Sequence, residues 1–491
     1  MNMERDVRAQ SASLNRKLCE KKVVKEISSD FLIPDDKPEA RRILVVSERL
    51  LPPAKYLGAS AVECNGLIDY RVIYLGVDGG LWGVCFSSEY ELEAPLDIRR
   101  TDTSGAVNTV ISAVCEGSTA RIGGGRRLGV KSRICADVWA YEELFDEGGV
   151  TRGDDESVEI LISDVSCADI TSATSDVIEL SGELGSEIGE GRVVSADATS
   201  YVREVRKGED SLMALGDVTV KLLWCRDGQA AEILVKKIPF EGVVELDRPV
   251  GNSSCVVDCS VTDLAVNLSE SGSYVSVSVT LSAYSAENLQ VSYASDAYSV
   301  ERECCCEMTE LILPVSGVMS VGNFSQSERR PLSETSIPEG ARLIEIFPRI
   351  IFDGCEYDGK YGLTGNSTYF ILWEKDGEYG VSDIEFPVRY EAEGRAVTDP
   401  VSACRGEVIF CRGRIDGELL CIDAEISARL FVNGCERAEP VQDLTFGDAF
   451  AKEKNRMVIY YPADDETPWQ VAKKYHVRAD SLASEKNYYI F

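Results

Sequence analysis

The chain has 491 residues, 44% of them hydrophobic and 27% charged, which is long enough for about three or four domains with substantial cores. Its net charge of −32 repels nucleic-acid phosphates and anionic lipid, so no nucleic-acid partner is expected. The single histidine, His476, excludes a zinc centre built from several histidines.

The N-terminal residues MNMERDVRAQ are polar and lack the apolar core of a signal peptide. No stretch of the chain approaches the ~20 apolar residues that a membrane span needs. The 17 cysteines form no CxxC pair, and the adjacent Cys304, Cys305 and Cys306 suggest no metal site. We therefore expect a cytoplasmic protein with no signal peptide, no membrane insertion, no metal and mostly reduced, structural thiols.

Three apolar strands, each closed by an aromatic residue, are predicted to run into an Asp-Gly turn. They read VIYLGVDG, LLWCRDG and ILWEKDG, and their turns contain Asp78, Asp227 and Asp376. Successive aspartates are 149 residues apart (227 − 78 and 376 − 227). Because Asp-Gly accepts the positive φ angles of a type I′ turn, each site predicts a tight β-hairpin.

A second landmark keeps nearly the same period. Leu128, Val275 and Ile422 each open a stretch of alternating apolar and polar residues, and 147 residues separate successive starts (275 − 128 and 422 − 275). Such alternation predicts a strand with one buried face. Together the landmarks predict a mainly β chain of three tandem antiparallel sandwich-like or barrel-like repeats. We place these repeats at residues 15–150, 151–300 and 301–450.

The remaining motifs within the repeats predict no catalytic site. Gly123, Gly124 and Gly125 lack the Lys-Ser/Thr of a phosphate-binding loop, so we expect them in a hairpin turn. Acidic clusters such as Asp35-Asp36 are expected to be solvated loop charge. The chain also lacks a GxSxG nucleophile elbow and an HExxH helix motif. We therefore expect neither enzymatic activity nor a cofactor.

A small α+β module is predicted at residues 455–491. Thr467, Pro468 and Gln470 form a capping box with proline at the favoured first position of a helix. A second short helix is expected over residues 479–486. Trp469, at the start of the first helix, has two interpretations: it fills a small core, or it borders a recognition loop.

The segment DETPWQVAKKYHVRADSL resembles the LysM pattern, Gly-Asp-Thr-Leu-Trp-x-Ile-Ala-x-x-Tyr. The matching residues are Thr467, Trp469, Ala472, Lys473, Tyr475, Val477 and Leu482. Asp465, Glu466 and Pro468 replace the glycine, aspartate and leucine of the pattern, and Asn487 falls one residue later than usual. The resemblance implies a partner-binding or glycan-binding site made of Asp465, Glu466, Thr467, Pro468, Trp469, Lys473, Leu482 and Asn487.

The three repeats resemble SPOCS domains of clostridial spore-coat proteins, through the aromatic-ended strands and the opening EISSDFLIPDDKPEARRIL. Three SPOCS-like repeats followed by a LysM-like module resemble the SipL family of spore-coat encasement proteins. That resemblance implies a non-enzymatic scaffold of the mother-cell cytoplasm that assembles at the forespore surface. It also implies that the LysM-like module contacts the ATPase of the coat basement layer, alongside other coat proteins. The alternative is a cell-wall protein whose module binds peptidoglycan or another GlcNAc-containing glycan.

Overall fold

The structure is a computed structural model that describes residues 14–98, 106–144, 157–175, 177–184, 188, 191–226, 230–268, 272–450, 459–463, 466–485 and 488–490. Most described residues before 450 lie in antiparallel strands, many of them long. The prediction of a mainly β fold is confirmed.

The first part of the chain forms two facing sheets, which we call unit 1. One sheet has the order β1-β7-β6 and the other the order β2-β4-β5. The strands are β1 (Leu14–Leu32), β2 (Ala40–Leu50), β4 (Ala61–Gly76), β5 (Leu81–Pro95), β6 (Val107–Gly123) and β7 (Arg127–Leu144), and the short β3 (Ala54–Leu57) also pairs with β4.

Unit 2 has the sheets β8-β14-β13 and β10-β11-β12, with β9 also paired to β14. Its strands are β8 (Val158–Thr174), β9 (Ile178–Leu184), β10 (Arg192–Lys207), β11 (Ser211–Cys225), β12 (Glu232–Glu245), β13 (Ser254–Asn267) and β14 (Ser273–Ser299). Unit 3 has the sheets β16-β21-β20 and β17-β18-β19. Its strands are β16 (Leu311–Pro331), β17 (Arg342–Tyr357), β18 (Tyr361–Lys375), β19 (Glu378–Ala392), β20 (Val401–Asp416) and β21 (Leu419–Ala438), and the 3₁₀ helix η2 (Leu332–Glu334) follows β16.

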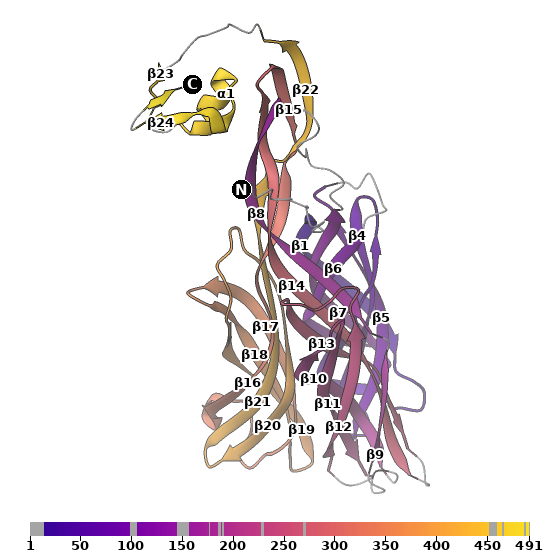
Figure 1. The fold of residues 1–491 in the computed structure, drawn as a ribbon. Coiled ribbons are helices and arrows are strands. Elements are labelled where there is room, and N and C mark those ends of the chain that lie inside the picture. Colours follow the sequence, from indigo (N-terminus) through magenta and orange to yellow (C-terminus); the bar gives the residue numbers. More distant parts are fainter. Residues whose placement is uncertain are drawn as a thin grey trace.

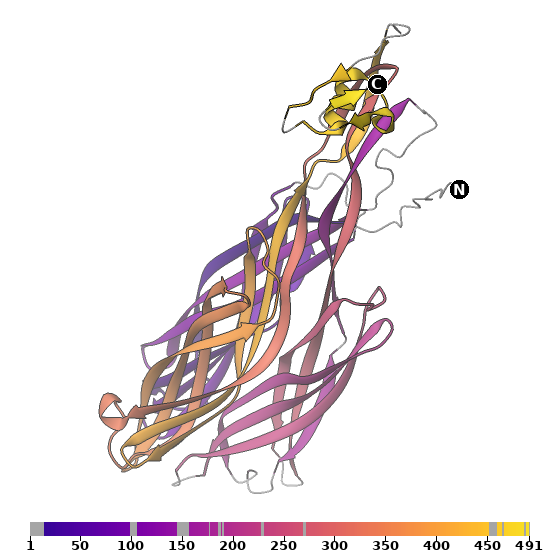
Figure 2. The ribbon, with the colours of Figure 1, turned by 60° about the vertical axis from the view of Figure 1, so that its left-hand side comes forward.

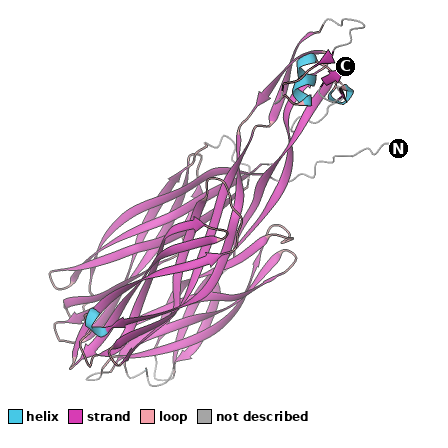
Figure 3. Cartoon of the chain, turned by 90° about the vertical axis from the view of Figure 1, so that its left-hand side faces the viewer, coloured by secondary structure: helices cyan, strands magenta, loops and turns pink. Residues whose placement is uncertain are grey.

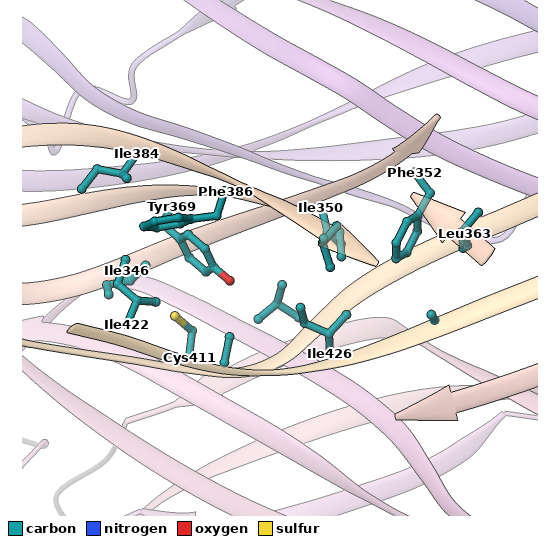
Figure 4. Packing of buried hydrophobic residues seen from close by; sticks show 14 of the residues in the cluster. Ile346, Ile350, Phe352, Leu363, Tyr369, Ile384, Phe386, Cys411, Ile422 and Ile426 are labelled. Carbon is teal, nitrogen blue, oxygen red and sulfur yellow. The ribbon is translucent and has the colours of Figure 1, made fainter. Parts of the chain in front are cut away.

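The order of the main strands is therefore the same in all three units, and the short β3 and β9 are additions to units 1 and 2. In each unit the first and last main strands pair, the last two form a hairpin, and three main strands between them form a meander. The alternating stretches are the middle strands β7, β14 and β21, and their apolar residues line the cores. In unit 2, for example, Val275, Val277, Val279 and Leu281 are all 0% exposed. Each core lies between the two sheets of its own unit, as Figure 4 shows for unit 3, where Ile350, Tyr369 and Ile426 lie close together.

The first and third Asp-Gly turns lie in equivalent hairpins but differ in shape. Asp376 and Gly377 have φ angles of 53° and 82°, as a type I′ turn requires. The type I′ prediction is wrong for the first turn, where only Gly79 has a positive φ. There the Asp78 carboxylate instead accepts hydrogen bonds from the Gly80 backbone (3.0 Å) and the Trp82 indole (3.0 Å), which hold a longer loop. Asp227 lies outside the described residues.

The three units pack against one another around a common centre. Ile73, Leu223 and Leu372, from β4, β11 and β18, meet in one buried cluster although they are 150 and 149 residues apart (223 − 73 and 372 − 223). Each residue directly precedes the aromatic residue of its strand, so this aromatic landmark also marks the contact between units. A second cluster joins Trp139 of unit 1, Tyr284 of unit 2 and Phe431 of unit 3.

Half-buried ion pairs link the units in a closed cycle. Arg71 of unit 1 pairs with Asp197 of unit 2. Lys221 of unit 2 pairs with Glu345 of unit 3 (3.3 Å), and Arg349 of unit 3 pairs with Glu48 of unit 1 (2.8 Å). Because removing one member of such a pair leaves a charge without its partner, the cycle favours one arrangement of the units.

A stalk rises from one end of this body (Figure 1). It begins with the ends of β8 and β14, which remain paired as far as Val158 and Ser299, and with the paired ends of β16 and β21. Val165, Leu313 and Ala438 are buried between these two ribbons. The hairpin-like pair β15 (Arg302–Met308) and β22 (Val441–Ala449) extends the stalk further. Figures 2 and 3 show the C-terminal module beside the far end of the stalk, away from the three units.

All 17 cysteines are free thiols, and Cys19, Cys64 and Cys259 are among those buried in the cores. Burial raises the pKa of Cys19 to about 11, and likewise that of Cys64. These thiols are therefore protonated at neutral pH and act as small apolar side chains.

Candidate partner-binding site on the C-terminal module

The module is built around one short helix and a small sheet. The strands β23 (Ile459–Tyr460), β24 (Ala483–Glu485) and β25 (Tyr488–Ile490) form the sheet in the order β23-β25-β24. Helix α1 spans Pro468–Tyr475. The expected second helix over residues 479–486 is wrong: only the 3₁₀ turn η3 (Ala479–Ser481) forms, and the chain then enters β24. The strand is favoured there because β25 offers it a backbone partner.

The start of α1 matches the prediction from the sequence. The Thr467 hydroxyl accepts a hydrogen bond from the Gln470 backbone (3.3 Å), and the Gln470 side chain accepts one from the Thr467 backbone (2.7 Å). Pro468 occupies the first position, where no backbone N–H is needed. The helix ends at His476, whose left-handed φ of 54° turns the chain away.

The module has a small core of its own. Val471 and Ala472 are 0% exposed, and the rings of Tyr460 and Tyr475 meet edge to face at 5.2 Å. The Tyr460 hydroxyl donates to Glu466 (2.7 Å), which fixes the segment before the helix. Trp469 is only partly buried.

Trp469 and Lys473 instead face the stalk, one helical turn apart. The Trp469 indole N–H donates to Oδ2 of Asp296 (2.9 Å), and the Lys473 ammonium donates to Oδ1 of the same carboxylate (2.6 Å). Burial alone would raise the pKa of Asp296, but the bonds from Lys473 and Trp469 outweigh it and lower that pKa. The Asp296 carboxylate is therefore charged at neutral pH and bridges both donors.

Tyr298, two residues along the same face of β14, completes the contact. Its ring meets Trp469 edge to face at 4.9 Å, and its hydroxyl donates to the Val477 carbonyl (2.7 Å). A further ring contact, between Phe450 and His476 at 3.9 Å, joins the module to the end of the stalk strand β22.

The other residues of the predicted site are dispersed. Thr467 and Pro468 are exposed, Glu466 and Leu482 are partly buried, and Asp465 and Asn487 lie outside the described residues. The structure thus brings together Trp469 and Lys473 of that set and adds Asp296 and Tyr298. No sequence signal identified these two residues, because they lie more than 170 positions away (469 − 296 = 173) in an ordinary alternating strand.

The thiols of β15 lie next to this contact. Cys306 donates to the Ala297 carbonyl (3.1 Å), and Cys304 lies two residues away, at strand spacing for the same face, whereas Cys305 is exposed. Burial raises the pKa of both Cys304 and Cys306. These two thiols are therefore poor nucleophiles at neutral pH.

A cavity of about 190 Å³ lies where the three units meet. Arg49, Arg71, Asp197, Arg349 and Glu407 are among the residues that line it. Burial would raise the pKa of Asp197, but Arg71 and Arg49 hold it at about 2. Because these charges pair chiefly with each other, the cavity belongs to the contact between units.

The chain matches no protein-family model, no curated protein and no solved structure. Among the described residues, no helix combines the length and the apolarity that crossing a membrane requires. The same residues include no group of three or more His, Cys, Asp or Glu side chains placed to share a metal ion.

Proposed function

We propose that this protein is a non-enzymatic scaffold of spore-envelope assembly in which the three-unit body is the structural part and the C-terminal module binds the partner. The observation that carries the proposal is the placement of the LysM-like module beside the end of a stalk, apart from the body. A module held there reaches a partner surface without obstruction by the units.

The construction of the body supports a structural role. Several of its buried charges pair between units, such as Lys221 with Glu345, and buried thiols such as Cys19 and Cys64 are protonated side chains of the cores. Three units locked by such pairs form a rigid support rather than a flexible string of domains.

The partner that the family resemblance implies is the ATPase of the coat basement layer, together with other coat proteins. We also propose that the three units are copies of one ancestral SPOCS-like domain. The shared strand order and the spacing near 149 residues support this proposal. The protein would then act from the mother-cell cytoplasm at the forespore surface.

A fluorescent fusion expressed in sporulating clostridial cells tests this function. We expect fluorescence to encircle the forespore from the mother-cell side and to become diffuse when the ATPase is deleted. A signal along the vegetative cell wall, unaffected by loss of the ATPase, would favour binding of peptidoglycan and contradict the proposal.

A further inference from the structure

One carboxylate on the stalk satisfies two donors of the module. Trp469 and Lys473 lie four residues apart on α1, and their polar atoms converge on the two oxygens of Asp296 at 2.9 and 2.6 Å. The Tyr298 ring covers the edge of the same indole at 4.9 Å. The module therefore carries a compact surface that recognises a carboxylate beside an aromatic ring.

The module also has stabilising contacts of its own. The helix is capped by its own residues, and the buried Val471 and Ala472 lie within the module. The contact is also small and incompletely buried: the Lys473 side chain remains 43% exposed and that of Asp296 26%. Small polar contacts between parts of a chain are readily released, so the surface can exchange one occupant for another.

The charge of the two parts favours the contact. Residues 451–491 contain seven Lys and Arg against six Asp and Glu, whereas the whole chain carries −32. Lys473 thus provides a positive group at the end of an acidic molecule. A partner that takes the place of Asp296 has to supply an anion of its own.

We propose that Asp296 and Tyr298 act as an internal ligand for the Trp469–Lys473 surface, and that a partner protein binds this surface by presenting a carboxylate next to an aromatic side chain in their place. The inference rests on the proposed function, because it specifies how the same module recognises its partner. While Asp296 and Tyr298 occupy the surface, the partner cannot bind there. The apparent affinity for the partner is therefore the intrinsic affinity multiplied by the fraction of molecules in which the surface is free.

The test measures binding of the full chain to the purified coat ATPase. Asp296→Asn keeps the size of the side chain and its acceptor for the Ala297 backbone, but it weakens the bond to Lys473. Glu307→Gln is the matched control, because it removes one negative charge from an exposed stalk residue on β15. We expect Asp296→Asn to tighten binding about five- to tenfold and Glu307→Gln to leave it unchanged.

Hydrogen exchange in α1 reports release of the module independently of any partner. It should speed up in Asp296→Asn and not in Glu307→Gln. Unchanged or weaker ATPase binding by Asp296→Asn would overturn the inference, because Asp296 would then either have no effect on ATPase binding or contribute to it directly.

A synthetic peptide of residues 293–299, which contains Asp296 and Tyr298, separates this inference from the proposed function. Added to the Asp296→Asn chain, it should restore slow exchange in α1, whereas the same peptide with Asn in place of Asp296 should not. If neither the wild-type chain nor Asp296→Asn binds the ATPase, the proposed function fails. Slow exchange in α1 restored by the peptide would still support the inference. Failure of the peptide to protect α1 overturns the inference even if the ATPase binds.

Discussion

Arg429 makes the most direct test of the contact between the three units, because it touches all of them. It lies on β21 of unit 3 with only 5% of its side chain exposed. Its guanidinium pairs with Asp258 of unit 2 at 2.7 Å and donates to the Ile111 carbonyl of unit 1 at 3.3 Å. The change Asp258→Asn leaves this buried cation without its counter-ion.

The expected cost follows from the burial of the pair. Removing one partner of a buried ion pair costs about 3–5 kcal/mol. Asp258 retains 19% exposure, and Arg405 lies 3.9 Å from the same carboxylate and shares it. We therefore expect a loss of about 3 kcal/mol in the free energy of unfolding, at the lower end of that range. Combining the change with Arg429→Met should cost less than the two single changes added together, by at least about 1.5 kcal/mol.

Urea unfolding followed by tryptophan fluorescence measures this effect, because Trp139, Trp224 and Trp373 place at least one reporter in each unit. The units should unfold in a single transition that shifts as a whole. Asp423→Asn is the control, since it breaks a solvent-exposed pair with Arg414 inside unit 3 and should change stability little. Separate transitions, or an Asp258→Asn that is no more destabilised than the control, would refute the argument that the units form one cooperative body.

Three further outcomes are expected. Gly83→Ala should destabilise the body by about 1–3 kcal/mol in thermal unfolding, because a Cβ at this position would lie 1.7 Å from the Val194 carbonyl oxygen of unit 2. A variant as stable as the wild type would contradict that packing. Burial raises the pKa of Asp137 to about 6, against the charge of Lys22, from 3.8. The folded state thus keeps a proton that the unfolded state has lost, so the contribution of this group to stability falls as pH rises from about 4 to 6. Urea unfolding at pH 4 and pH 6 measures this fall in the free energy of unfolding, and Asp137→Asn should reduce it by up to about 2 kcal/mol. An unchanged pH dependence in Asp137→Asn would contradict the raised pKa of Asp137. Trp469→Ala should leave the unfolding of the body unchanged while it speeds hydrogen exchange in α1; loss of body stability would show that the module is part of the cooperative fold.

The sequence predicts the local structure well where one strand has one buried face. The alternating residues from Leu128, Val275 and Ile422 are buried as expected, because strand period and burial are local properties. The capping box of Thr467 and Gln470 is also local and is confirmed. The turn at Asp78 is not the predicted type I′ turn, because the indole N–H of Trp82 donates a hydrogen bond to the Asp78 carboxylate. The Asp-Gly pair alone does not reveal this interaction.

The arrangement of the units and the docking of the module were not predictable in the same way. Arg71, Asp197 and Glu345 resemble solvated charges on the polar face of a strand, and only the assembled units pair them. Trp469 had two expected roles within or around its own module, yet its indole binds Asp296 on a strand far away in sequence. Contacts of this kind depend on where complete elements meet, which a hydrophobic pattern does not specify.

Binding of the purified 491-residue chain to the coat basement-layer ATPase, compared with Trp469→Ala, tests the proposed scaffold function most directly. Tyr56→Ala is the matched control, because it removes an exposed aromatic side chain from β3 of the body, where Tyr56 is 58% exposed. We expect the wild-type chain and Tyr56→Ala to bind equally and Trp469→Ala to lose about thirtyfold in affinity, as truncation of an aromatic anchor commonly does. Undiminished binding by Trp469→Ala, or tight binding to peptidoglycan with none to the ATPase, would contradict the account.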